Sequence, residues 1–259
     1  MKLSSTFLSG LAGLVLYYCT TAQVVATPRD DDFVLNNIIH IMYHEAGHAL
    51  IDQFELPVIG QEEDAADAFA TINVIDAFEN FDVLLSDTAM AMIALQDASD
   101  SDDIDFFSEH DLDIQRGMRI ICFGVGAEPD KFKDIAASFE MTHEQIENCA
   151  DRFDQSMLGW HDLLKSSYRK EDAPRADLRI SYAPSDTYKK ERALLLNSAV
   201  LEDFGADLVD QFAWGSKLKI IARECGEANA FYEPATGSIS ICYEMMTLLR
   251  GLDTGLENE

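Results

Sequence analysis

The sequence predicts a helix-rich α+β domain whose small sheet is built from the last third of the chain. Apolar residues recur at helical spacing through most of residues 33–165, whereas strand-like runs separated by turn residues begin only near residue 178. The chain has 259 residues, 47% of them hydrophobic, which suffices for one sizeable core or at most two small ones. We therefore expect a single domain over residues 33–259, with a helical part at 33–165 and a sheet-bearing part at 178–250.

The N-terminus is typical of an export signal. Lys2 supplies a positive charge, an apolar segment with flanking small residues follows, and small residues before Ala22 and Ala26 provide cleavage sites. The apolar segment is short and interrupted by serines, which favours cleavage over a retained membrane anchor. We expect removal of residues 1–22, or 1–26 if the second site is used. The mature protein is then periplasmic or extracellular, without a stable membrane anchor.

The helical part contains segments whose ends are marked by capping and breaking residues. In the first segment Asp32 is the expected N-cap, and Pro57 and Gly60 should end the helix. The acidic segment 97–105 lacks the glycine and the terminal glutamate of an EF-hand calcium loop, so we expect a solvated loop. Helices are expected at residues 33–54, 61–78, 81–96, 113–126 and 143–164.

The pattern changes after a connector at residues 165–177. Short runs with strand propensity alternate with helical segments, and a turn with Pro234 and Gly237 separates the last two runs. The expected order is a strand at 178–184, a helix at 187–212, a strand at 217–225, a hairpin at 228–243 and a closing helix at 244–252.

The cysteines favour two disulfides. Cleavage of the signal removes Cys19 and leaves four cysteines, an even set in an exported chain. Four cysteines allow three pairings, and closeness in sequence favours Cys122–Cys149 and Cys225–Cys242. None of the four has the spacing of zinc ligands, so a cysteine zinc site is not expected.

The charge balance argues against one class of partner. The chain has 47 acidic and 19 basic residues, a formal net charge of -28. Such a surface repels a phosphate backbone, so nucleic-acid binding is not expected.

The segment "YHEAGHAL" carries the strongest functional signal. His44 and His48 are four residues apart, so on a helix their rings project from one face and both can reach one zinc ion. Glu45 is offset around the helix, where it can hold a water molecule instead of the metal. The alternative is a helix whose histidines, together with His40, merely form a polar stripe.

A catalytic zinc site usually needs a third protein ligand, and the acidic turn "GQEEDAAD" supplies candidates. Glu63 and Asp67 share one face of the second expected helix. Glu63 can then bind zinc while Asp67 accepts a hydrogen bond from the other ring nitrogen of His44. Glu62, Asp64 and Asp67 remain alternatives for the third ligand. An acidic first turn that stabilises the helix dipole is the structural alternative.

Two blocks resemble a bacterial metallopeptidase family of unknown function. They are "FVLNNIIHIMYHEAGHALIDQFELPVIGQEEDAADAFAT" near the N-terminus and "CGEANAFYEP…ISICYE" near the C-terminus, so the resemblance spans nearly the whole mature chain. The resemblance implies a zincin-like peptidase of the glutamate-ligand kind. It also implies His44, His48 and Glu63 as zinc ligands and Glu45 as general base.

The chain departs from better-known glutamate zincins in two ways. The motif "NExxSD" is missing, and "EEDAAD" shares only its spacing of four between Glu and Asp. The zincin sheet normally precedes the active-site helix, whereas the strands here follow it, as if the order were permuted. One strand of the 228–243 hairpin could then form the edge along which an extended peptide binds.

The expected activity is zinc-dependent hydrolysis of a peptide or protein substrate. Glu45 takes a proton from water and passes it to the leaving amine. A further donor should stabilise the oxyanion, and His110, Tyr232 and Tyr243 are the candidates. The alternatives are an exported zinc-binding or interaction protein without turnover, and a zinc amidase that acts on cell-wall peptides.

Overall fold

The computed structural model describes residues 30–98, 108–215 and 217–252. The expected signal segment, with Cys19, and most of the acidic segment 97–105 lie outside the described residues. Within the described ranges, no helix combines the length and the apolar character needed to cross a membrane.

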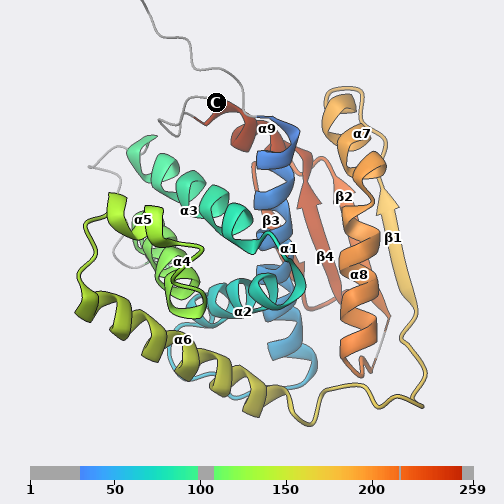
Figure 1. The fold of residues 1–259 in the computed structure, drawn as a ribbon. Helices are drawn as coiled ribbons and strands as arrows, with labels where there is room; N and C mark the ends of the chain where they lie inside the picture. The colour runs from blue at the N-terminus through green and yellow to red at the C-terminus, as the bar shows by residue number, and fades with distance from the viewer. Residues whose placement is uncertain (1–29, 99–107, 216, 253–259) are drawn as a thin grey trace, which may run out of the picture.

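The fold is α+β and helix-rich, as the sequence predicts, with helices in the first part of the chain and a small sheet in the last part (Figure 1). Among the described residues the helical part comprises α1 (Asp31–Gln53), α2 (Glu62–Ala77), α3 (Phe81–Ala98), α4 (Asp113–Ala127), α5 (Lys133–Ser138) and α6 (His143–Leu164). The last part comprises β1 (Leu178–Tyr182), α7 (Lys189–Ser198), α8 (Val200–Gln211), β2 (Leu218–Arg223), β3 (Ala230–Glu233), β4 (Ser238–Cys242) and α9 (Tyr243–Gly251).

The sheet is mixed, with the strand order β1-β2-β4-β3. Strands β1, β2 and β4 run parallel, and β3 and β4 form an antiparallel hairpin of which β3 is the first arm. In the register Ile220 lies beside Ile239, and both are fully buried. The hairpin therefore places β3 at one edge of the sheet.

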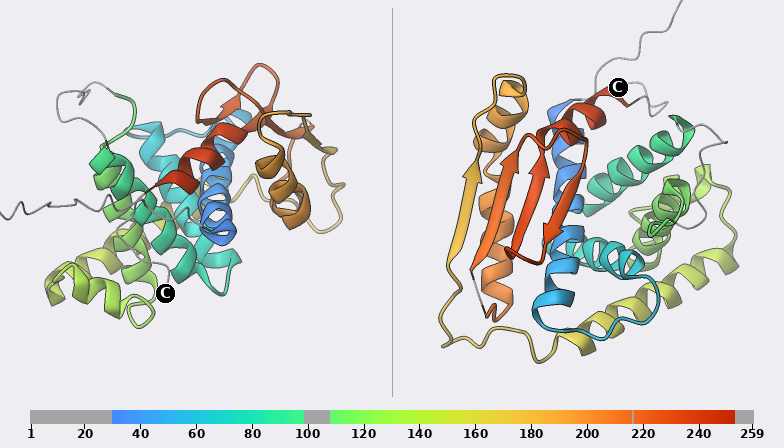
Figure 2. Two further views of the ribbon diagram at one scale, coloured as in Figure 1. Left: turned by 90° about the horizontal axis from the view of Figure 1, so that it is seen from above. Right: turned by 180° about the vertical axis from the view of Figure 1, so that it is seen from behind.

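Helix α1 is the centre of the structure. It contacts α2 and α3 on one side and β3, β4 and α9 on the other. Figures 1 and 2 show α1 and α8 on the same face of the sheet, with α1 over β3 and β4 and α8 over β1 and β2. Fourteen residues of α1 are buried, which explains why its sequence is apolar around almost the whole helix.

Three local features differ from the sequence prediction. The segment 187–212 is two helices, because Ala199 adopts a left-handed backbone (φ 57°) between α7 and α8. Asn197 and Ser198 precede the break and are poor helix formers whose side chains compete for backbone groups. The N-cap of α1 is Asp30, not Asp32: its carboxylate accepts the N–H of Phe33 at 2.8 Å. The short helix α5 was not predicted.

Two disulfides among the described residues link neighbouring segments of the fold. Cys122 of α4 is bonded to Cys149 of α6, and Cys225 is bonded to Cys242 at the end of β4. These are the two pairs that closeness in sequence favours. The second joins the segment after β2 to the far arm of the hairpin and so fixes the end of the sheet that leads into α9.

The backbone at Ala199 generates a stability prediction. A left-handed conformation costs a residue with a Cβ about 1–2 kcal/mol, and glycine avoids most of this cost. Ala199→Gly should therefore raise the free energy of unfolding by about 1 kcal/mol in denaturant titrations. The matched control, Ala193→Gly inside α7, should lower it by about 1 kcal/mol. Equal destabilisation by the two substitutions would contradict the break at Ala199.

Candidate metal centre

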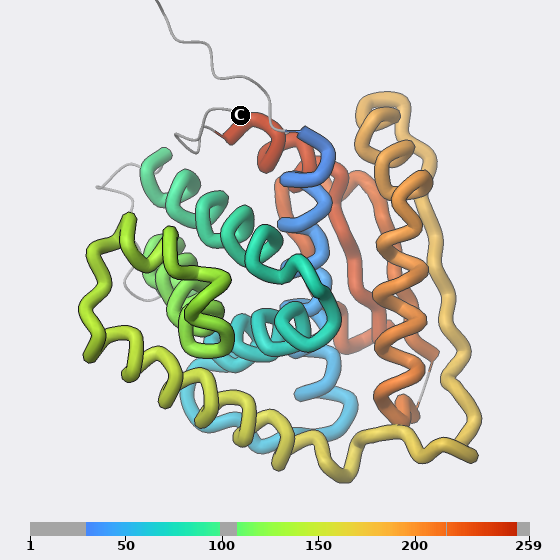
Figure 3. Tube along the Cα trace, in the orientation of Figure 1, coloured from blue at the N-terminus to red at the C-terminus, as the bar shows by residue number. Residues whose placement is uncertain are grey.

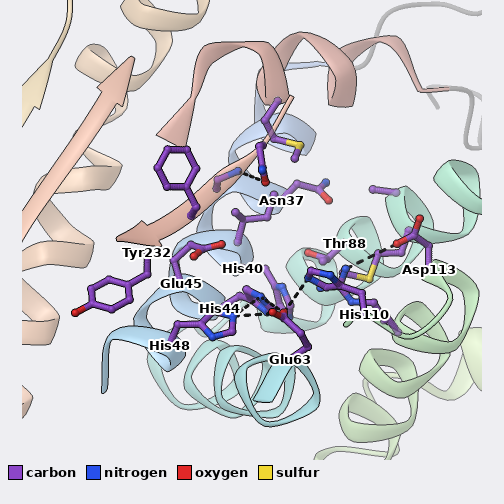
Figure 4. Close-up of a pocket in the computed structure, with 18 of the residues that line it drawn as sticks. Asn37, His40, His44, Glu45, His48, Glu63, Thr88, His110, Asp113 and Tyr232 are labelled. Atoms are coloured by element: carbon purple, nitrogen blue, oxygen red, sulfur yellow. Dashed lines mark hydrogen bonds and ion pairs between the residues drawn. The ribbon is translucent and has the colours of Figure 1, made fainter. Parts of the chain in front are cut away.

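Helix α1 brings three functional candidates to one place. His44 and His48 project from the same face, with ring centroids 4.9 Å apart, and Glu45 lies on the β3 side of them (Figure 4). His44 and Glu45 are each only 6% exposed. The surrounding packing thus fixes α1 at the positions of His44 and Glu45. A preorganised site requires such a fixed backbone.

A close crossing of α1 and α2 brings a carboxylate to the histidines (Figure 3). A Cβ on Gly47 would lie 3.0 Å from the Cα of Ala66, so the backbones approach closely because both residues are small. Glu63 lies at the start of α2. Its Oε2 atom is 3.1 Å from Nε2 of His44 and 3.3 Å from Nε2 of His48.

The other ring nitrogen of each histidine faces a carboxylate. Nδ1 of His44 lies 2.8 Å from Asp67, and Nδ1 of His48 lies 2.8 Å from Glu62. An ionised carboxylate can only accept a hydrogen bond, so each Nδ1 carries a hydrogen. In the neutral imidazoles both Nε2 atoms then present lone pairs, the tautomer that metal-binding histidines adopt.

The three converging atoms have the geometry of a metal-ligand set. The Nε2 atoms of His44 and His48 are 3.2 Å apart, so with Glu63 Oε2 they form a nearly equilateral triangle. Ligands about 2.0–2.1 Å from a tetrahedral zinc ion lie about 3.3–3.4 Å from one another. Glu63 Oε2 is buried, yet no hydrogen bond of normal geometry reaches it. A cation bound by all three atoms satisfies this oxygen, so the residues fit a metal ion.

The charges around the site also favour a cation. Burial lowers the pKa of His44, but its hydrogen bond to Asp67 and its contact with Glu63 outweigh burial and raise this pKa to about 9. Burial raises the pKa of Glu63, but the imidazoles of His110, His44 and His48 outweigh it and hold the pKa well below its usual range. The carboxylates of Glu63 and Asp67 thus favour a positive charge beside the two histidines, and a divalent cation supplies one.

Arg116 of α4 is a part of the site that the sequence analysis missed. Its Nε and Nη2 atoms donate to the two oxygens of Asp67, each at 2.8 Å, while Asp67 accepts from His44. Burial raises the pKa of Asp67, but Arg116 and His44 outweigh it and keep this pKa far below its usual value. Arg116 therefore keeps Asp67 ionised and fixed toward His44.

Arg119, one turn further along α4, was missed as well. It donates to Asp64 of α2 and to Asp111, which follows His110. Arg116 and Arg119 are three residues apart, so they share a face of α4. Two arginines on one face of an apolar helix are the signal in the sequence that indicates buried acidic partners.

The expected oxyanion donors lie in three different environments. His110 is nearest the metal-ligand set: its Nε2 is 2.8 Å from Oε2 of Glu63, and its side chain is 45% exposed. The hydroxyl of Tyr232 donates to Asp52 at 2.7 Å, so it points away from the histidines (Figure 4). Tyr243 is fully buried and donates to the carbonyl of Ala183, outside the cavity that His110 lines.

Tyr232 contributes its backbone instead of its hydroxyl. Its backbone N–H lies beside the carboxylate of Glu45 and tends to lower the pKa of this group. Burial has the larger effect and raises the pKa of Glu45 above its usual value. His40, one turn before His44, is a structural residue: its Nε2 lies 3.1 Å from Thr71 Oγ1, and burial lowers its pKa to about 3.

A cavity of about 420 Å³ opens beside the cluster. It is lined by residues of α1, α2, α3, α4, α9 and the edge strand β3, together with His110. His44, Glu45 and Glu63 all face it, so a ligand in the cavity contacts both the metal-ligand set and the glutamate beside it (Figure 4). Such a site can hold a metal ion and expose it to a ligand or to water.

A family model described as "putative metallopeptidase" matches residues 15–164 and 182–255. The match includes all the residues of the cluster and the edge strand β3. No curated protein and no solved structure matches the chain.

The buried pair Arg116–Asp67 generates a prediction about stability. Asp67→Asn removes the closer carboxylate partner of Arg116 and leaves the contact with Asp113 at 3.8 Å. Breaking a buried ion pair costs about 3–5 kcal/mol. We expect a loss of about 3 kcal/mol in the free energy of unfolding. Asp64→Asn removes a more exposed partner of Arg119 and should cost less than about 1 kcal/mol. Similar losses in the two variants, measured by denaturant titration, would contradict the role assigned to Asp67.

Proposed function

The chain belongs to this metallopeptidase family, and from that premise we propose that it is a zinc-dependent peptidase that hydrolyses peptide bonds with Glu45 as general base. The observation that carries the proposal is the triangle formed by His44, His48 and Glu63, whose edges of 3.1–3.3 Å match tetrahedral zinc. Glu45 lies beside this triangle in the same cavity. Metal binding alone does not require that carboxylate.

His44, His48 and Glu63 would hold the zinc ion, and Asp67 would orient His44 through its Nδ1–H. Two imidazole nitrogens and one carboxylate oxygen are a donor set that suits catalytic zinc and leaves one position open. When bound, zinc lowers the pKa of water and polarises the scissile carbonyl. Glu62 accepts the Nδ1–H of His48 at 2.8 Å, which supports Glu63 over Glu62 as the third ligand.

Glu45 is positioned to move the proton in this reaction. The raised pKa of Glu45 makes its carboxylate a stronger base than an ordinary glutamate. It can therefore accept a proton from the attacking water and return it to the leaving amine. The backbone N–H of Tyr232 lies beside this carboxylate, on the β3 side of the site. His110 is the proposed oxyanion donor, because it alone of the three candidates reaches the metal-ligand set with its side chain.

Strand β3 is the proposed docking edge for the substrate backbone. It lies at the edge of the sheet, and Ala230, Phe231 and Tyr232 line the cavity. The carbonyls of Ala230 and Tyr232 point away from β4, because the N–H of Cys242 bonds to the carbonyl of Asn229 and alternate residues face opposite ways. The N–H of Ala230 already bonds to Oδ1 of Asn229, and the N–H of Tyr232 lies beside Glu45. An extended peptide can therefore donate its N–H groups to these two carbonyls beside Glu45.

Export is part of the proposal. The two disulfides, Cys122–Cys149 and Cys225–Cys242, fit an oxidising compartment. The signal-like segment before residue 30 supports the same location, periplasmic or extracellular.

The metal centre is tested by zinc content. The mature protein should bind about one zinc ion per chain, and the double variant His44→Ala, His48→Ala should bind none at equal zinc concentration, because two of three protein ligands are lost. The matched control is His143→Ala, His161→Ala, since both of these side chains are well exposed. Elemental analysis that finds equal zinc in the two double variants would rule out this site.

The role of Glu45 separates an enzyme from a zinc-binding protein without turnover. Glu45→Gln keeps the shape of the side chain but cannot take the proton of water. Hydrolysis of a peptide library should fall by a hundredfold or more, on the order of the contribution of a general base. Zinc content and unfolding should change little. Glu128→Gln, an exposed glutamate, is the control and should retain full activity. Unchanged, chelator-sensitive turnover in Glu45→Gln would remove Glu45 from the mechanism.

A further inference from the structure

The cavity beside the metal-ligand set continues along α1 toward the N-terminal end of this helix. Asn37, Ile41 and Glu45 all line it and recur every four residues, so they lie along one face of α1. At 1.5 Å per residue, the distance from Asn37 to Glu45 along the axis is about 12 Å. Ile41 therefore lies one helical turn beyond the carboxylate of the proposed base.

Helices α3 and α9 form the walls of this extension, which we name the apolar arm. Its apolar lining residues are Ile41, Ala91, Met92, Leu95, Met245 and Leu249. Ala91 and Leu249 are each about 1% exposed and so lie at the innermost end of this lining. Ile41, Leu95 and Met245 are half-buried and present the accessible surface of the arm.

The polar residues of the apolar arm each make a hydrogen bond within their own helix. Nδ2 of Asn37 donates to the carbonyl of Phe33 at 2.9 Å, and the hydroxyl of Thr88 donates to the carbonyl of Leu84 at 2.9 Å. Asn37 keeps its second N–H and its Oδ1 at one end of the arm. A polar ligand group buried among the apolar residues has no hydrogen-bond partner there, so the apolar lining disfavours polar side chains.

Two charged residues of α4 also line the cavity, and they define the rival hypothesis. Arg116 donates to both oxygens of Asp67, so its charge is already matched. Asp113 lies 3.8 Å from Arg116 and would be the group to recognise a basic side chain. Asp113 belongs to α4 and is not among the α1, α3 and α9 residues of the apolar arm, so the apolar lining has the larger influence on what the arm binds.

We propose that the apolar arm binds the side chain of the substrate residue next to the scissile bond, and that it selects leucine, methionine or phenylalanine there. The inference rests on the proposed function. One residue of an extended chain spans about 3.3–3.6 Å. Ile41, the residue of the arm nearest to Glu45, lies one helical turn from it along α1. When the scissile carbonyl is at the metal centre, the side chain of the next substrate residue can therefore reach the arm.

The test uses amino-acid hydroxamates, which bind metals without being hydrolysed. Glycine, leucine, phenylalanine and lysine hydroxamates are titrated calorimetrically into the zinc-loaded protein. Leucine and phenylalanine hydroxamates should bind at least about tenfold more tightly than glycine hydroxamate, since burying such a side chain is worth one to two factors of ten in affinity. Lysine hydroxamate should gain no such advantage.

Ala91→Leu should fill the apolar arm. The affinity of leucine hydroxamate should fall to within about threefold of that of glycine hydroxamate, whose own affinity should not change. The matched control is Ala206→Leu, the same substitution at an exposed position of α8, and it should keep the tenfold preference. If Ala91→Leu does not fold, Met245→Ala provides a second test: it widens the arm and should favour phenylalanine over leucine hydroxamate.

Three results would overturn the inference: equal binding of glycine and leucine hydroxamates, a leucine preference that Ala91→Leu leaves intact in a folded protein, or tightest binding of lysine hydroxamate with loss in Asp113→Asn. Titration needs no turnover. A leucine preference without peptide hydrolysis therefore supports the arm and refutes the proposed peptidase, whereas hydrolysis without an apolar preference does the opposite. Failure of zinc binding, measured separately, would refute the metal centre and the inference together.

Discussion

The close crossing of α1 and α2 is the constraint on which the rest of the site depends. Gly47 and Ala66 allow the two backbones to approach until a Cβ at residue 47 would touch the facing Cα. Only at this separation does Oε2 of Glu63 come within 3.3 Å of both Nε2 atoms, while Asp67, one turn later, reaches the Nδ1 of His44. The β3–β4 hairpin and α9 pack against the opposite side of α1. This packing keeps His44 and His48 close to α2.

The crossing of α1 and α2 brings several carboxylates together, and two arginines of α4 neutralise those around the metal-ligand set. Asp67 is 3% exposed and is held by the guanidinium of Arg116. Asp64 pairs in the same way with Arg119 on the same face of α4. Within the part of the chain that the structure describes, the ion-pair contacts of Glu63 are with the imidazoles of His44, His48 and His110, and one of its oxygens has no hydrogen bond of normal geometry. The two arginines therefore neutralise Asp67 and Asp64. The negative charge of Glu63, at the centre of the site, favours a bound cation.

The sequence predicts those parts of this arrangement that depend on local periodicity. The α+β class, the helix boundaries of the first part and the facing spacings of His44 with His48 and of Glu63 with Asp67 follow from repeats of three to four residues. The partnership of Asp67 with Arg116 does not, because 49 residues separate the two and only the packing of α4 on α2 joins them. The break at Ala199 was missed because the apolar pattern continues through it.

The most direct test of this account is a crystal structure of the zinc-loaded protein with anomalous diffraction recorded at the zinc edge. The account predicts one strong anomalous peak about 2.0–2.2 Å from Nε2 of His44, Nε2 of His48 and a carboxylate oxygen of Glu63. The Nδ1–H groups of the two histidines should still face Asp67 and Glu62. A zinc ion bound through Glu62 or Asp67 in place of Glu63, or no peak between α1 and α2, would contradict it.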